Sequence, residues 1–183
     1  MGDEKLIIKL MKGDSSAFDE VVTTYQSMVI NVCYGFSGNR EDAEDIAQDV
    51  FIKIWEKIHS FKNEASLKTW IYRIAVNASL NFIRKQKFHA LLENLDKAFL
   101  FVMEGHDPEE ETRLKEQKNR VRKAIGLLPK NQRIAITLQH MNDLSYYEIA
   151  EIMETSVSSI ESLIFRAKKN LRKKLYKYYF SGQ

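Results

Sequence analysis

An apolar stripe with helical spacing runs along the front of this chain. Between residues 17 and 34 the apolar side chains recur at steps of three and four, as they do along one face of an α-helix. They are Phe18, Val21, Val22, Tyr25, Met28, Val29 and Val32. The chain has only two prolines and seven glycines, and its frequent Ala, Leu, Ile, Lys, Glu and Gln favour helix. We therefore predict an all-α fold.

Two further helical patterns follow this stripe. Asn39 is placed to cap a helix that continues to about His59, because an Asn side chain accepts hydrogen bonds from the exposed N–H groups of a first turn. The polar stretch 60–66 breaks the period, and a third long helix is predicted over about 67–87. Three helices joined by short loops make a small bundle, so we predict a first domain over residues 1–87.

Residues 88–111 separate this bundle from a second helical block. They end in an acidic run that contains Asp107 and Glu109 to Glu111. Such a run is either a solvated linker or an interaction tail, and the sequence leaves both open. We predict a linker over 88–111 and a second domain over 112–183.

The second domain contains the pattern helix, tight turn, helix. Ser145 and Glu148 have the spacing of a capping box, and a polar turn over 154–156 leads into the last helix. The side chains expected on the inner face of that helix are Val157, Ile160, Leu163, Ile164, Ala167, Leu171 and Leu175. We therefore predict two small helical domains, the second of them a helix-turn-helix.

In a helix-turn-helix the second helix enters the major groove of DNA. The outward positions of the last helix are Ser158, Ser159, Glu161, Ser162, Arg166 and Lys169. Hydroxyls and arginine suit base edges and phosphates, and glutamate accepts from cytosine. Residues 112–183 also carry a net charge of +9, against −6 for residues 1–111, which favours phosphate binding by the second domain. The alternative is an ordinary solvated helix face.

Two consecutive helices of the first domain have opposite chemistry. Residues 42–55 offer a carboxylate-rich face that suits a basic protein surface, whereas residues 67–85 interleave aromatic, amide and cationic side chains, as single-stranded nucleic acid prefers. Phe61 lies in a polar loop, where a place in the hydrophobic core is less automatic. Trp70 is interpreted either as a core residue or as a base-stacking platform.

The sequence argues against an enzyme. It contains no phosphate-binding glycine loop and no metal-ligand spacing such as His-Glu-x-x-His. The carboxylates Asp42, Glu44, Asp45 and Asp49 suggest a metal site of a nuclease, but their spacing wraps around the helix. We expect no catalytic residue, cofactor or metal.

Cys33 is the single cysteine, so the chain cannot form an intramolecular disulfide. The N-terminus lacks a basic segment followed by a long apolar run, and no apolar stretch approaches the roughly 18 residues that cross a bilayer. We expect a buried, inert thiol and a cytoplasmic protein.

Several strings of residues together resemble the extracytoplasmic-function (ECF) sigma factors of the bacterial sigma-70 family. These strings cover 42–51 (DAEDIAQDVF), 69–77 (TWIYRIAVN), 128–129 (LP), 147–150 (YEIA) and 164–167 (IFRA). The resemblance implies that the first domain is sigma region 2 and that the second is sigma region 4. The implied partners are core RNA polymerase, promoter DNA and an anti-sigma factor.

The resemblance also implies roles for individual residues. Core RNA polymerase would be bound by Asp45, Gln48, Asp49 and Ile52. A flipped base of the melted −10 element would be held by Phe61, Asn63 and Asn77, with Lys53, Arg73 and Arg84 on the DNA backbone. The duplex −35 element would be read by Ser158, Ser159, Glu161, Ser162, Arg166 and Lys169. Because serines stand where many relatives have arginine, the −35 sequence itself is not implied.

The resemblance further implies that the free chain binds promoter DNA poorly. Two small domains on a flexible linker lose orientational freedom when both bind, and core polymerase would fix their separation. The alternative is a regulator that binds duplex DNA through the same helix-turn-helix without polymerase, as a dimer on half-sites one helical turn apart.

Overall fold

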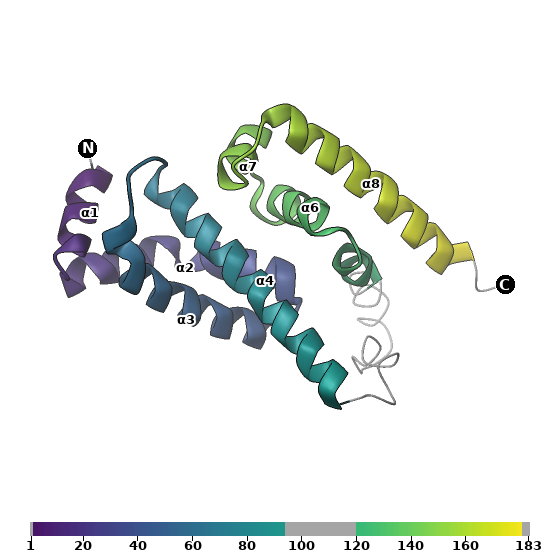
Figure 1. The fold of residues 1–183 in the computed structure, drawn as a ribbon, viewed down its shortest axis with the longest axis horizontal. Helices are drawn as coiled ribbons and strands as arrows, with labels where there is room; N and C mark the ends of the chain where they lie inside the picture. The colour runs from purple at the N-terminus through teal and green to yellow at the C-terminus, as the bar shows by residue number, and fades with distance from the viewer. Residues whose placement is uncertain (1, 94–119, 181–183) are drawn as a thin grey trace.

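Figure 1 shows the computed structural model, which describes residues 2–93 and 120–180. Every secondary-structure element in these two ranges is helical, which confirms the predicted all-α fold. The labelled helices are α1 (Gly2–Met11), α2 (Ser15–Ser37), α3 (Arg40–Lys57), the 3-10 helix η1 (Ile58–Ser60), α4 (Leu67–Glu93), α6 (Lys130–Asn142), α7 (Tyr146–Ile152) and α8 (Val157–Phe180). A further helical segment covers 120–126.

Polar caps fix where the first helices begin and end. The carboxylate of Asp14 accepts hydrogen bonds from the first turn of α2. Gly38 ends α2 in the left-handed region, at φ +76°, and donates its N–H to the carbonyl of Tyr34. The side chain of Asn39 accepts from the N–H of Glu41 at 2.8 Å, which confirms the predicted cap of α3.

Helix α4 is longer than predicted. It ends at Glu93 instead of at Lys87, because neither proline nor glycine interrupts residues 67–93. The first residues of the predicted linker are therefore helical. The acidic run with Asp107 and Glu109 to Glu111 lies outside the described residues.

The N-terminal helices form the predicted bundle around a hydrophobic core. Val21, Val32, Val50 and Ile71 are fully buried between α2, α3 and α4. Cys33 is buried too, and burial raises the pKa of its thiol to about 11. In the described part of the chain, none of the helices is both long enough and apolar enough to span a bilayer.

The C-terminal helices form the predicted helix-turn-helix. Ser145 and Glu148 complete the capping box of α7, and α8 buries Ile160, Ile164 and Ala167. Val157 was expected to face inward, but 39% of its surface is exposed. It is the first residue of α8, where the helix has not yet reached the hydrophobic core.

The two helical blocks pack against each other. Their buried side chains form one continuous hydrophobic cluster that extends from α1 to α8. Helix α7 lies beside the first turns of α4, and α6 packs against α2 (Figure 1). The sequence pattern predicted both blocks but not this contact between them.

Candidate protein and nucleic-acid interfaces

The acidic face of α3 is free to meet another protein. Its outward side chains are Asp45, Gln48, Asp49 and Ile52, and all four are exposed. Their spacing of i, i+3, i+4 and i+7 places them on one stripe, while the opposite side of the helix is buried. Ile52 is 56% exposed, so an apolar side chain stands at the end of a polar, mostly acidic stripe.

One face of α4 exposes amides and a cation. Asn77, Asn81 and Arg84 are all exposed, and they recur at steps of three and four along the helix. The intervening Ala78 and Ser79 are buried. The structure thus brings two of the predicted strand-binding residues, Asn77 and Arg84, onto one solvent-facing line.

The loop before α4 differs from the prediction. Phe61 is only 7% exposed, and its ring packs against Trp70 with 5.2 Å between centroids. A place in the hydrophobic core was less automatic for Phe61 because of its polar neighbours, but the structure places it there, because Trp70 extends that core under the loop. Asn63 is exposed and adopts φ +59°, a left-handed conformation that Asn tolerates better than most residues. Lys53 is half-buried.

Arg73 is engaged by the other helical block. One terminal nitrogen donates to the backbone carbonyl of Glu151 at 2.7 Å, and the other lies 2.8 Å from the carboxylate of Glu154. Its side chain is 27% exposed. Glu154 forms the tight turn after α7 at φ +52°, which is uncommon for a residue other than glycine. The turn residue of the helix-turn-helix therefore also binds Arg73.

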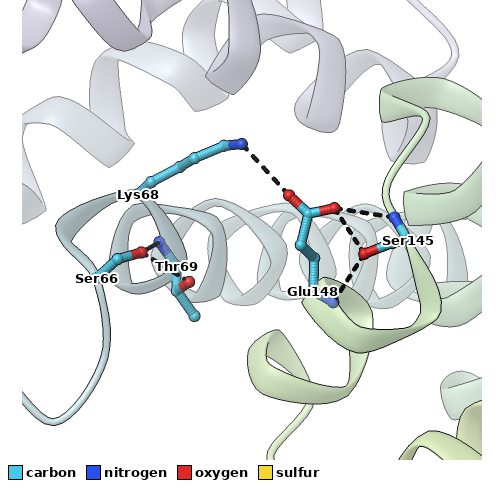
Figure 2. Close-up of polar contacts among 5 residues, drawn as sticks. All are labelled: Ser66, Lys68, Thr69, Ser145 and Glu148. Atoms are coloured by element: carbon cyan, nitrogen blue, oxygen red, sulfur yellow. Dashed lines mark hydrogen bonds and ion pairs between the residues drawn. The ribbon is translucent and has the colours of Figure 1, made fainter.

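A second ion pair joins α4 to α7. The ammonium of Lys68 lies 3.5 Å from the carboxylate of Glu148, as Figure 2 shows beside the cap that Ser66 provides for α4. The backbone N–H and then the hydroxyl of Ser145 are the main causes that lower the pKa of Glu148, and Lys68 lowers it further. Burial, with a smaller contribution from Glu148, raises the pKa of Tyr72 to about 12.

Arg122 joins the two helical blocks at the other end of their interface, beside the C-terminal end of α2. One of its nitrogens donates to the carbonyl of Gly38 at 3.0 Å, and another hydrogen-bonds the hydroxyl of Tyr34. Its guanidinium also stands 4.5 Å from the centre of the Tyr34 ring. Sequence reasoning missed Arg122, since one cation just beyond a linker has no local pattern that reveals a partner 84 residues earlier.

The outward strip of α8 is solvent-exposed as predicted. The exposed members are Ser158, Glu161, Ser162, Arg166 and Lys169. Ser159 differs, because it is half-buried and its N–H donates to the hydroxyl of Ser156 at 3.2 Å, so it belongs to the cap of the helix. Phe165 was not predicted, yet it is 70% exposed at a position three residues after Ser162 on the same strip.

Comparison with known proteins identifies both blocks. A family model described as Sigma-70 region 2 matches residues 21–89, and one described as Sigma-70, region 4 matches residues 118–171. The chain is 35% identical over 179 residues to the ECF RNA polymerase sigma factor SigW of Bacillus subtilis, with 94% of this chain and 96% of that protein covered. It is 34% identical to the ECF RNA polymerase sigma-E factor of Haemophilus influenzae, with 94% and 95% covered.

The chain belongs to the ECF sigma factors. Sigma factors direct core RNA polymerase to promoters, and this sigma factor carries both DNA-binding regions in the family's order. A regulator that acts without polymerase is not favoured, because residues 21–89 match region 2 and not a sensing or dimerisation domain.

Solved structures support the fold of this sigma factor. CnrH in complex with the cytosolic domain of CnrY has a TM-score of 0.67 at 22% identity, with 94% of this chain and 96% of that chain covered. The sigma factor RpoE of Bartonella quintana, solved in complex with the anti-sigma factor NepR, has a TM-score of 0.61 at 26% identity, with 86% and 96% covered.

Proposed function

We propose that this sigma factor divides its work among three faces, on α3, α4 and α8. The observation that carries the proposal is that matches to region 2 and region 4 lie in order on one chain. Region 2 contains two stripes of exposed polar side chains, on α3 and α4, and region 4 contains one, on α8. Each stripe has a different chemistry, which suits a different partner.

The stripe on α3 binds core RNA polymerase. Asp45 and Asp49 offer carboxylates at one helical turn's spacing, and Gln48 adds an amide between them. Complementary charge steers two proteins together, and the exposed Ile52 supplies apolar area that is buried on docking. A basic surface of polymerase with an apolar pocket would meet both requirements.

The face of α4 and the loop before it hold the melted −10 strand. Asn77 offers an amide that can pair with the edge of an unstacked base, while Arg73, Arg84 and Lys53 bind the phosphate backbone. Asn63 adds a second exposed amide in the loop. Phe61 takes part only when the loop releases it from Trp70, since the aromatic ring is buried in the free chain.

The strip on α8 reads the duplex −35 element. Ser158, Glu161 and Ser162 lie near the start of the helix, where base edges are reached, and Arg166 and Lys169 neutralise phosphates. Ser159 supports the strip through the cap that it forms with Ser156. The exposed ring of Phe165 suits the methyl group of a thymine.

An anti-sigma factor is the expected inhibitor of this protein. The support is that its solved relative RpoE, at 26% identity, was determined in complex with the anti-sigma factor NepR. Such a partner would compete with polymerase for the free chain.

The proposal is tested by transcription with reconstituted polymerase. Core RNA polymerase mixed with this chain and genomic DNA of its host should start transcripts at discrete sites that share two upstream elements. At such a promoter, Asn77→Ala should impair strand opening more than polymerase binding, because the amide contacts DNA only after melting. Gln26→Ala, which removes an exposed amide from α2, serves as the matched control. An equal loss of melting and polymerase binding would remove Asn77 from the strand-binding set.

A further inference from the structure

A cavity of about 300 Å³ lies between the C-terminal end of α2, the helical segment 120–126 and α6. This volume is at the lower end of the range for sites that bind small molecules. Four lining side chains can carry a positive charge, and they are Arg122, Lys123, Arg133 and His140. None of the described residues that line the cavity is an aspartate or a glutamate. Its positive charge is therefore not balanced by the described part of the chain.

Two polar groups of the cavity wall are buried without a partner. The guanidinium Nε of Arg133 and the hydroxyl of Thr137 form no hydrogen bond with any described residue, although Thr137 is only 2% exposed. Burial also lowers the pKa of Arg133. Buried polar groups in folded proteins are nearly always paired, and a threonine inside a helix commonly bonds the carbonyl four residues earlier. The missing partners indicate that the cavity accepts a ligand with hydrogen-bond acceptors.

The carbonyl end of α2 does not cancel the positive charge. A helix C-terminus carries a partial negative charge, but the carbonyl of Gly38 accepts a hydrogen bond from Arg122 at 3.0 Å. The same guanidinium lies 4.5 Å from the centre of the Tyr34 ring, so Arg122 is held at the wall. Neither Lys123 nor Arg133 forms an ion pair with a described residue. These two cations are left to meet an anion.

The rest of the wall is mainly apolar. Phe36 and Ile136 line the cavity, and Ile136 is only 1% exposed. The guanidinium of Arg133 lies 6.0 Å from the centre of the Phe36 ring, so charged and apolar walls adjoin. A bare inorganic anion would leave the apolar wall unfilled, whereas an anion with an apolar body would cover both.

We propose that this cavity binds a small organic anion. Its phosphate or carboxylate head is held by Arg133, Lys123 and the hydroxyl of Thr137, and its apolar body, about the size of one ring, lies beside Phe36. A guanidinium binds either head through paired N–H groups. The site uses no residue of α3, α4 or α8, so it is independent of the faces proposed for polymerase and DNA.

The test titrates four probes into the full free chain, labelled for amide NMR. They are phenyl phosphate, benzoate, inorganic phosphate and benzyl alcohol. The amides of Gly35, Gly38 and Gly126 belong to lining residues, whereas Gly13 does not line the cavity. Phenyl phosphate or benzoate should shift the three lining amides with a Kd of about 1 mM or tighter, and the tighter of the two identifies the head. Inorganic phosphate and benzyl alcohol should bind at least about fivefold more weakly, because each lacks one half of the ligand. Equal binding of inorganic phosphate, or equal shifts at Gly13, would overturn the proposal.

Three variants test the residues that hold the head. Arg133→Gln and Lys123→Gln should each weaken binding of the tighter probe about 3- to 10-fold. Lys130→Gln removes an exposed cation of α6 that does not line the cavity, and it should change binding less than about twofold. Thr137→Val should weaken binding about threefold and keep or raise the melting temperature, since it removes a buried hydroxyl that has no partner. A lower melting temperature with unchanged affinity would instead assign Thr137 a purely structural role and remove it from the site. If Arg133→Gln does not fold, Lys123→Gln and Thr137→Val decide the question.

The chain's own acidic residues at 109–111 are the competing occupant. Replacing these three glutamates by glutamine should leave the affinity for the tighter probe unchanged within about twofold. A gain of about tenfold or more would mean that carboxylates of the chain compete for the site at high effective concentration, and it would overturn the proposal of a separate ligand.

Discussion

The side chains proposed to bind DNA differ between region 2 and region 4 in how far other parts of the chain engage them. On α8 the outward strip is exposed except at Ser159, so the proposed duplex-binding surface needs no rearrangement to meet a groove. In region 2, Arg73 is bound to α7 and the turn after it, and Phe61 is buried against Trp70. Asn63, Asn77 and Arg84 of the same proposed set are exposed. The surface proposed for duplex DNA is therefore more fully exposed than the one proposed for melted DNA.

The proposed functions give a physical reason for this difference in exposure. A duplex is present before polymerase arrives, so a permanently exposed helix can sample it. An unpaired strand exists only after melting, and an exposed site for it would attract any single-stranded nucleic acid.

Core substitutions in the two regions should have the largest effects, and they test whether the regions are stabilised together. Ile71 in α4 and Ile160 in α8 are fully buried, and replacement of either by alanine should cost about 2–5 kcal/mol of unfolding free energy. Because one hydrophobic cluster joins the blocks, Ile160→Ala should also lower the hydrogen-exchange protection of α2 amides.

Native-state hydrogen exchange followed by mass spectrometry measures both effects. The exposed Lys12→Ala provides the baseline for a surface change. If Ile160→Ala lowers protection in α6 to α8 alone, the two regions unfold separately. The shared hydrophobic cluster would then couple their stabilities only weakly.

A pair of arginine variants, with effects of intermediate size, should distinguish the proposed duplex contact of region 4 from the proposed strand contact of region 2. In the polymerase complex, Arg166→Ala should weaken binding to a closed duplex promoter and reduce the salt slope by about 1, because one phosphate contact is lost. Arg73→Ala should leave closed-duplex binding nearly unchanged and impair opening. Filter binding over a series of salt concentrations distinguishes the two, and an unchanged slope for Arg166→Ala would exclude it from the phosphate contacts.

Acid should loosen the contact between the regions, which is the smallest effect expected. Hydrogen bonds from Ser145, and then Lys68, hold the pKa of Glu148 below its ordinary value of 4.5. A lowered folded-state pKa stabilises the fold above the unfolded value, and this contribution is lost as the pH falls through the folded pKa. We expect α7 amides to exchange faster, relative to their intrinsic rates, below about pH 4.5.

Glu148→Gln is the control for this pH dependence. The amide oxygen can still accept from Ser145, as Gln does in a capping box, but it has no proton to gain over this range. An identical acid response in Glu148→Gln would assign the effect to other carboxylates.

Local patterns were sufficient to predict most of the fold. Asn39 and Ser145 capped the helices expected of them, and the outward strip of α8 followed from its apolar period. The length of α4 was underestimated because the end of a helix without proline or glycine has no local signal. Val157 was misplaced for a related reason, since periodicity does not show where a helix first meets the core.

The contacts between the regions were beyond sequence reasoning. Arg73 and Glu154 are far apart along the chain, and the sequence alone predicts that each is an ordinary charged residue on the surface. The burial of Phe61 depends on Trp70 lying under its loop, a tertiary fact that overrides the polar neighbours of Phe61. A sequence does not distinguish a charged residue that pairs within the chain from one that binds a partner.

Because Phe61 packs on Trp70, the fluorescence of Trp70 should report on the conformation of the proposed base-binding loop. The chain has two tryptophans, Trp55 and Trp70, and both lie in region 2. Fluorescence excited in tryptophan but not in tyrosine therefore reports on region 2 alone. Trp55, which packs edge-on against Phe18, contributes the part of this emission that does not depend on the loop. When the loop releases Phe61, the emission of Trp70 should shift, so the moment of opening is visible in the natural chain without any attached dye.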